Sequence, residues 1–84
     1  MDPAESVNIT VCGRPLVVHH RDVLAAVDSG TFGPVRQHAV EINGALYPVK
    51  EVFARVTGLD VLDFNTVQAR TTLRRLGFRL RTVS

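Results

Sequence analysis

The fold is decided by residues 38–58, HAVEINGALYPVKEVFARVTG, where a β-hairpin leads directly into a helix. Asn43-Gly44 separates two short strand-like runs and is the preferred pair for a type I′ turn, because both turn positions need a positive φ. Pro48 follows, and its missing N–H suits the first turn of a helix. Apolar side chains then recur at i, i+3, i+4 and i+7, which predicts a buried helical stripe ending before Gly58. The stripe consists of Val49, Val52, Phe53 and Val56.

The residues before this stretch predict a second hairpin and a short helix. Residues 7–11 alternate apolar and polar side chains, which is the period of a half-buried strand. Residues 12–15 contain Gly and Pro and predict a turn, and residues 16–18 predict the returning strand. A helix is expected over residues 21–28, with Gly30 in the left-handed conformation that ends it.

The residues after this stretch predict one more helix and one more strand. Either Asn65 or Thr66 is suited to cap a helix whose body runs over residues 67–76. Gly77 ends that helix, and residues 78–81 alternate as a final strand. The order of elements is therefore β-β-α-β-β-α-α-β. This order predicts an α+β fold with a small, mostly antiparallel sheet, two hairpins and three short helices.

Length and composition predict a single domain. The chain has 84 residues, of which 45% are hydrophobic and 21% charged, the balance of a soluble globule. We expect residues 1–6 to be disordered and residues 7–84 to form one α+β domain, since the chain is too short for a second core. The single cysteine excludes an internal disulfide framework and favours a cytoplasmic location. Short apolar runs and an N-terminus without a signal-peptide layout predict no membrane association.

Charge is divided unevenly along the chain. Residues 1–63 hold all eight acids and five cationic residues, a net charge of −3, whereas residues 64–84 hold five arginines and no acid, a net charge of +5. Arginine binds phosphate oxygens in a bidentate manner better than lysine does, so this segment favours a polyanionic partner. The alternative is that these arginines pair with the acids of residues 1–63 and become locally neutral. The five are Arg70, Arg74, Arg75, Arg79 and Arg81.

A helical wheel over residues 67–76 separates a core side from an outward side. The core side contains Ala69, Thr72, Leu73 and Leu76. The outward side contains Val67, Arg70, Thr71, Arg74 and Arg75. In the strand that follows, Arg79 and Arg81 lie on the face opposite Phe78 and Leu80. A helix with three outward arginines and no acid predicts a nucleic-acid-binding surface, with the Asn43-Gly44 hairpin beside it in the manner of a wing.

Double-stranded DNA, rather than RNA, is the partner that this surface predicts. Arg70 and Arg74 lie one turn apart on one face, and their guanidinium groups could read guanine O6 and N7 or clamp phosphates. Arg75, Arg79 and Arg81 would contact the backbone without regard to base sequence. With three to five phosphates neutralised, log K should fall against log salt with a slope of about −3 to −4.5.

Lys50 is the further candidate for the nucleic-acid-binding site. It lies in the first turn of the predicted helix after Pro48, where the helix dipole disfavours a cation, and such a residue can serve an anionic ligand. The alternative is a solvated lysine beside Glu51.

No pattern in the sequence indicates catalysis, a metal or a cofactor. Zinc sites need converging ligands at short spacing, but Cys12 is alone and the adjacent His19 and His20 point to opposite faces if extended. His38 is distant in the sequence. A phosphate-binding glycine loop, a carboxylate pair and an activated nucleophile are also absent. We therefore expect a non-enzymatic protein without cofactor or metal.

Three segments together resemble a known small domain: residues 39–52 (AVEINGALYPVKEV), 63–66 (DFNT) and 72–78 (TLRRLGF). The pattern Tyr-Pro-x-Lys, Phe-x-Thr and Leu-Arg-Arg-Leu-Gly-Phe is similar to short actinobacterial proteins and to the N-terminal head of McrA-like HNH restriction endonucleases. The resemblance implies a DNA-associated accessory domain in a bacterial cytoplasm, with Lys50 and the Arg74-Arg75 pair as the matching polar positions. The HNH catalytic segment has no counterpart here.

A second class of function is a protein-interaction or dimerisation module. In that case Val67 and the outward arginines would meet an acidic partner chain or a second copy of the protein.

Overall fold

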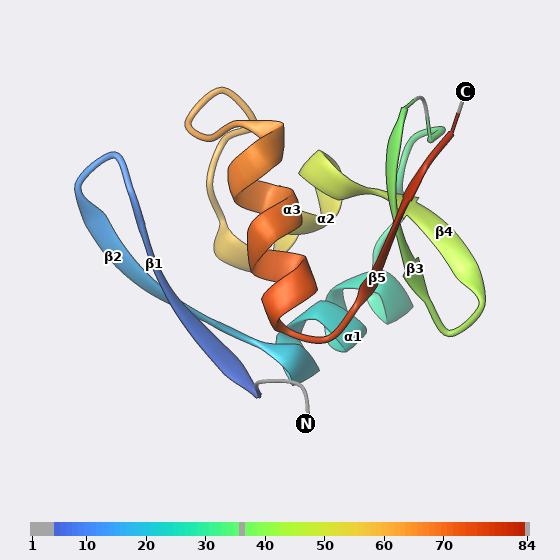
Figure 1. The fold of residues 1–84 in the computed structure, drawn as a ribbon, viewed down its shortest axis with the longest axis horizontal. Helices are drawn as coiled ribbons and strands as arrows, with labels where there is room; N and C mark the ends of the chain where they lie inside the picture. Colours follow the sequence, from blue (N-terminus) through green and yellow to red (C-terminus); the bar gives the residue numbers. More distant parts are fainter. Residues whose placement is uncertain (1–4, 36, 84) are drawn as a thin grey trace.

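The strands and helices follow one another in the predicted order and form an α+β fold (Figure 1). The computed structural model describes residues 5–35 and 37–83. The elements are β1 (Ser6–Val11), β2 (Arg14–His19), α1 (His20–Ser29), β3 (His38–Ile42), β4 (Ala45–Pro48), α2 (Val49–Thr57), α3 (Thr66–Arg75) and β5 (Arg79–Thr82).

The five strands divide between two separate antiparallel sheets. One sheet holds only β1 and β2, and the other has the order β4-β3-β5. The C-terminal strand β5 therefore lies on the opposite side of β3 from β4, with Val40 facing Tyr47 on one side and Leu80 on the other. In Figure 1, α3 lies between the β1–β2 hairpin and the three-stranded sheet.

The hairpin and helix expected over residues 38–58 are confirmed. Asn43 and Gly44 have φ values of 52° and 82°, as a type I′ turn requires. Pro48 ends β4 and precedes the first residue of α2, so the helix begins one residue later than expected. Gly58 has a φ of 76°, and its N–H donates to the Ala54 carbonyl at 2.8 Å, which ends α2.

The hydrophobic core is built around α2 and α3. Phe53 of α2 and Leu73 of α3 are fully buried, and the Phe53 ring meets the Phe64 ring edge to face with centroids 4.6 Å apart. Such edge-to-face pairs add to the stabilisation that burial of the two rings provides. Buried residues from both sheets pack around them, among them Val7, Val11, Val18, Val40 and Ile42. The core therefore holds the inner face of α3 in place and leaves its other face free.

Several boundaries differ from the sequence-based expectation: α3 and β5, expected over residues 67–76 and 78–81, are Thr66–Arg75 and Arg79–Thr82. The first turn comprises only Cys12 and Gly13, because β2 already begins at Arg14 and includes Pro15. Proline fits there because β2 belongs to a two-stranded sheet, in which one edge needs no N–H. Helix α1 is one residue longer at each end than the expected range.

Gly30 is not in the predicted left-handed conformation. Its φ of −102° and ψ of 157° are extended. Glycine is required for a different reason: a Cβ at this position would lie 2.7 Å from the Ala26 carbonyl oxygen and 3.2 Å from the Phe32 ring. The glycine therefore allows the chain to pass close to the end of α1. The sequence pattern indicated the helix end correctly, but the reason is steric and not a left-handed conformation.

The predictions for the two ends of the domain can be compared only in part. Residues 1–4 and 84 lie outside the described residues. The expected disordered segment over residues 1–6 is too long, because β1 begins at Ser6 and the Glu5 carbonyl accepts a hydrogen bond from the His20 N–H at 2.8 Å. Among the described residues, no helix has the length and apolar character needed to cross a bilayer.

Candidate nucleic-acid interface

The N-terminus of α3 is closed by a reciprocal capping box. The Asn65 side chain accepts a hydrogen bond from the Gln68 N–H at 2.8 Å, and the Gln68 side chain accepts from the Asn65 N–H at 3.0 Å. Of the two capping residues that the sequence allowed, the structure uses Asn65. The capping box fixes where the helix begins, and this in turn fixes which side chains face the core and which face solvent.

The core side of α3 is as predicted. Ala69, Thr72, Leu73 and Leu76 are all buried. The Thr72 hydroxyl donates to the Gln68 carbonyl at 2.9 Å, so the one polar group on this side has a partner within the helix. Because these four side chains are packed in the core, α3 cannot turn about its axis to bring its charged side inward.

The outward side of α3 carries cations without acidic partners. Thr71, Arg74 and Arg75 are exposed, and α3 itself contains no acid. In the part of the chain that the structure describes, none of the arginines of α3 forms an ion pair. Both Arg74 and Arg75 lie in the last turn, where a cation also complements the helix dipole.

Arg70 departs from the expectation of a fully outward side chain. It is half-buried, and its Nε is inaccessible to solvent and has no hydrogen-bond partner. The reason is its position on the helix, because it directly follows the buried Ala69 and lies one turn before the buried Leu73. Its aliphatic stem thus lies along the boundary of the core, in the manner of other long cationic side chains.

Strand β5 contributes the remaining two arginines, and one of them is neutralised. Arg79 and Arg81 are exposed on the face opposite Phe78 and Leu80, as predicted. The Arg81 guanidinium, however, donates to the Glu41 carboxylate at 3.0 Å, with exposed fractions of 49% and 31% for the two side chains. The expectation that all five C-terminal arginines are unpaired is therefore wrong at Arg81.

The pairing of β5 with β3 explains this ion pair. In the register of the two strands, Glu41 lies directly opposite Arg79, and Arg81 is the next residue on the same face of β5. Diagonal neighbours in an antiparallel pair are within reach of a long side chain. Glu41 therefore lies beside both arginines of β5.

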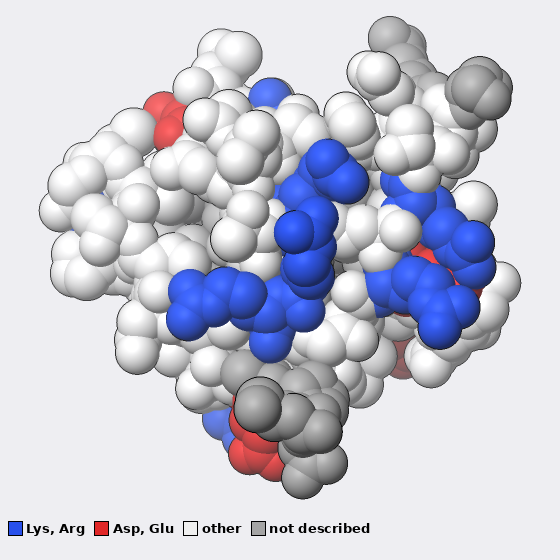
Figure 2. Space-filling view, in the orientation of Figure 1, with Lys and Arg blue, Asp and Glu red and all other residues white. Residues whose placement is uncertain are grey.

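Arginine side chains gather on one face of the molecule. Figure 2 shows a continuous column of them over α3 and a second group over β5 and the strands beside it. Acidic atoms are visible directly beneath the second group, whereas uncharged residues line the two sides of the column over α3 on this face. We call the exposed or half-buried residues Arg70, Thr71, Arg74, Arg75 and Arg79 the basic face.

Lys50 is not brought into this group by any described contact. Its Nζ lies 5.5 Å from the centroid of the Phe64 ring, a cation–π arrangement that explains a cation in the first turn of α2. It also lines a separate groove together with His38 and Thr66. The structure thus offers a local reason for Lys50 that sequence reasoning did not consider.

The histidines and Cys12 occupy separate structural positions. His20 stacks on Phe78 with ring centroids 4.4 Å apart, and the exposed Cys12 donates from its Sγ to the Asp63 carbonyl at 3.3 Å. Over residues 5–35 and 37–83, no three His, Cys, Asp or Glu side chains converge as metal ligands would.

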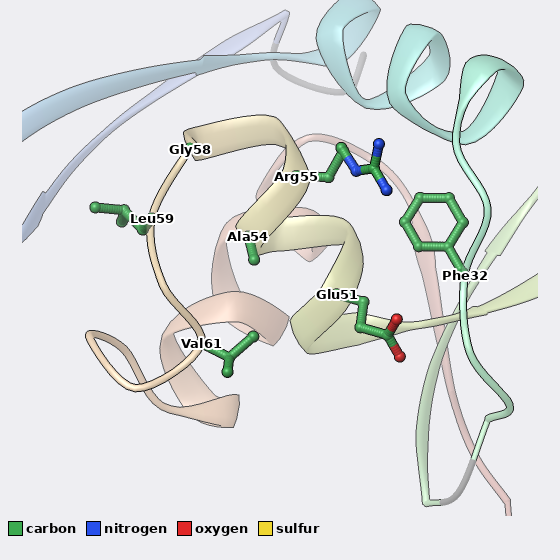
Figure 3. Close-up of a pocket in the computed structure, with 7 residues that line it drawn as sticks. All are labelled: Phe32, Glu51, Ala54, Arg55, Gly58, Leu59 and Val61. Carbon is green, nitrogen blue, oxygen red and sulfur yellow. The ribbon is translucent and has the colours of Figure 1, made fainter.

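A second hollow lies at the C-terminal half of α2, and its polar groups are engaged with the protein itself. The Glu51 carboxylate accepts a hydrogen bond from the Gly33 N–H at 3.0 Å, and the Arg55 guanidinium lies 5.5 Å from the Phe32 ring centroid (Figure 3). These contacts attach the loop before β3 to α2. The two charged side chains of the hollow, Glu51 and Arg55, therefore serve to anchor that loop.

The basic face is the arrangement best suited to bind a ligand. Its guanidinium groups offer hydrogen-bond donors in a fixed geometry and complement phosphate oxygens or the acceptor edge of guanine. No protein-family model, curated protein or solved structure matches this chain.

Proposed function

We propose that the chain is a non-enzymatic DNA-binding domain that uses α3 and β5 to contact double-stranded DNA. The observation that carries this proposal is that the three arginines of α3 have no acidic partner among the described residues, while the opposite side of that helix is buried in the core. Nucleic-acid-binding proteins use such surfaces because each neutralised phosphate releases bound counterions.

The dimensions of α3 agree with a major-groove contact. Its ten residues extend about 15 Å, and the major groove of B-DNA is about 12 Å wide and admits one helix. Arg70 and Arg74, one helical turn apart, would enter deepest, while Arg75 and Arg79 would bind phosphates on either side. The deep, narrow major groove of A-form RNA excludes such a helix, which favours DNA over RNA.

The β3–β4 hairpin would lie against the DNA backbone as a wing does. It belongs to the same sheet as β5, so a helix seated in the groove would bring this sheet toward the neighbouring phosphates. The resemblance to the head domain of McrA-like endonucleases supports a DNA-associated role in the cytoplasm of a bacterium, in particular an actinobacterium.

The test compares two double variants of equal net charge. Replacing Arg70 and Arg74 by alanine should weaken binding of a short DNA duplex at least tenfold, because both side chains lie on the basic face. The control of equal charge replaces Arg14 of β2 and Arg21 of α1, which are exposed, as Arg74 is, but lie on other elements. It should change affinity less than twofold. Fluorescence anisotropy with a labelled duplex measures both.

Equal weakening by the two double variants would show that overall charge, and not the basic face, attracts the duplex. An NMR titration of the parent protein adds a positional readout. Amide shifts confined to residues 66–81 and reduced by salt support the proposal. Shifts centred elsewhere contradict it.

A second candidate function is binding of an acidic protein partner beside α3. The observation that favours it is the exposure of Val67 at the start of α3. This apolar residue is 69% exposed because it lies on the side of the helix opposite the core. Leu62, in the loop before α3, is 88% exposed. Exposed apolar side chains next to cations are typical of protein-binding surfaces. Concentration-dependent sedimentation without DNA tests the case in which the partner is a second copy.

A further inference from the structure

A groove of about 330 Å³ separates β1 from α3. One wall is formed by four consecutive residues of β1, 8–11, and the other by the side of α3 that runs from Val67 to Arg75. The groove shares Thr71 and Arg75 with the basic face, but its β1 wall has no part in the DNA-binding proposal.

The wall on the β1 side is an open strand edge. Successive side chains of a strand point to opposite faces of its sheet, so a groove lined by four consecutive residues of one strand runs along that strand's edge. Among the residues that the structure describes, this sheet contains only β1 and β2, and no residue of β2 lines the groove. In Figure 1 the ribbons of β1 and β2 cross, and β1 is the strand nearer to α3 in the half of the hairpin next to its turn.

The register of the hairpin identifies the main-chain groups at this edge. The two-residue turn places Val11 opposite Arg14 as the hydrogen-bonded pair that closes the hairpin. Hydrogen-bonded and non-hydrogen-bonded pairs alternate along antiparallel strands, so Thr10 and Asn8 belong to non-bonded pairs. Pro15 opposite Thr10 agrees with this assignment, because it has no N–H to donate. The N–H and C=O groups of Asn8 and Thr10 therefore point away from β2.

The side chains along the groove define which ligand fits. Val67 supplies an apolar surface, and Arg75 supplies a cation that forms no ion pair with any described residue. None of the described residues that line the groove is acidic. The walls thus combine free main-chain donors and acceptors, one apolar position and one positive charge.

We propose that this groove binds an extended peptide segment that adds a strand to the free edge of β1. Its main chain would pair with Asn8 and Thr10, one of its apolar side chains would cover Val67, and one of its carboxylates would meet Arg75. Strand addition supplies affinity through main-chain hydrogen bonds and specificity through alternate side chains. This inference deepens the second candidate function, because it specifies the conformation and charge of the protein partner.

The probe is a short capped peptide of alternating threonine and valine with aspartate at both ends, so that either strand direction brings a carboxylate to Arg75. Titration into the ¹⁵N-labelled protein should shift the amides of residues 8–11 and 67–75. A peptide with lysine in place of aspartate should bind at least tenfold more weakly, because it would place a cation against Arg75. Arg75→Gln should reduce the preference for aspartate over lysine.

Two changes test the main-chain pairing directly. Thr10→Pro removes an N–H at the groove edge, whereas the matched control Val17→Pro removes an N–H at the opposite edge of the same sheet. Thr10→Pro should abolish peptide binding and Val17→Pro should preserve it. N-methylation of alternate residues of the peptide gives the same test without any change in the protein, so the result does not depend on how the proline variants fold.

Several outcomes would overturn the inference. The first is that the peptide shifts no amide of residues 8–11. The second is that the N-methylated peptide binds as tightly as the unmodified peptide. The third is that self-association or duplex DNA shifts residues 8–11 and the peptide does not. Shifts confined to the arginines of α3, with Thr10→Pro binding as tightly as the parent, would refute strand addition while leaving the broader protein-binding function intact. Duplex-induced shifts centred on residues 8–11 would also contradict the DNA-binding proposal, whereas the results with the peptide do not bear on it.

Discussion

Glu41 is the residue that determines how many arginines of the C-terminal segment are free to bind a polyanion. Its carboxylate pairs with Arg81 at 3.0 Å and lies opposite Arg79 in the strand register. Exposed ion pairs contribute little to stability, so the main effect of this one is on the charge that β5 presents. Within the DNA-binding proposal, Glu41 therefore opposes binding.

The substitution Glu41→Gln should strengthen DNA binding, because it frees Arg81 and removes a negative charge beside Arg79. One additional phosphate contact would steepen the dependence of log K on log salt by about 0.9. Fluorescence anisotropy at several salt concentrations measures both quantities. In an Arg81→Ala background the slope should not steepen, and a steeper slope there would show that Glu41 acts through another group.

At the residue scale, the sequence predicted the positions of the arginines better than their environments. Periodicity placed Arg74 and Arg75 outward because it reports the angle of each residue around the helix axis. It could not report that Arg70, at the edge of the buried side, has an enclosed Nε. Nor could it identify Glu41 as the partner of Arg81, because that contact spans 40 residues and exists only once β5 pairs with β3.

At the element scale, the position of α3 depends on its N-terminal capping box. Asn65→Ala removes the acceptor for the Gln68 N–H and should lower the free energy of unfolding by about 0.5–2 kcal/mol. Urea denaturation measures this change. Asn65→Ser keeps a good capping side chain and should retain most of the stability. If Asn65→Ala were as stable as the parent, the first turn of α3 would not depend on this hydrogen bond.

Elements with a local cause were predictable, whereas the partnering of strands was not. The Asn43-Gly44 turn and the Gly58 helix end follow from the conformational preferences of neighbouring residues, and both are confirmed. Gly30 shows the limit of that reasoning, because a glycine is needed there to avoid a clash with the Ala26 carbonyl and the Phe32 ring. The division of the strands into two sheets, and with it the groove beside β1, depends on long-range packing that no local pattern encodes.

At the scale of the whole molecule, the relevant quantity is the number of free cations on one face. Of the five arginines in residues 64–84, Arg81 is paired and the other four form no ion pair with a described residue, which leaves four for DNA. The slope of log K against log salt should therefore be about −3.6, within the range expected from the sequence. Binding isotherms between about 50 and about 200 mM salt measure it. A slope near zero would contradict a phosphate-dominated contact.

The separation of β1 and β2 from the other strands has a consequence for how the domain opens. Within residues 5–35 and 37–83, sheet hydrogen bonds link this hairpin to no other strand, and a hydrogen bond from the His20 N–H to the Glu5 carbonyl joins it to α1. Regions with few such links exchange their amide protons through local opening, at a lower free energy than global unfolding. In deuterium oxide, the amides of this hairpin should therefore lose their protons before those of β3 and α3.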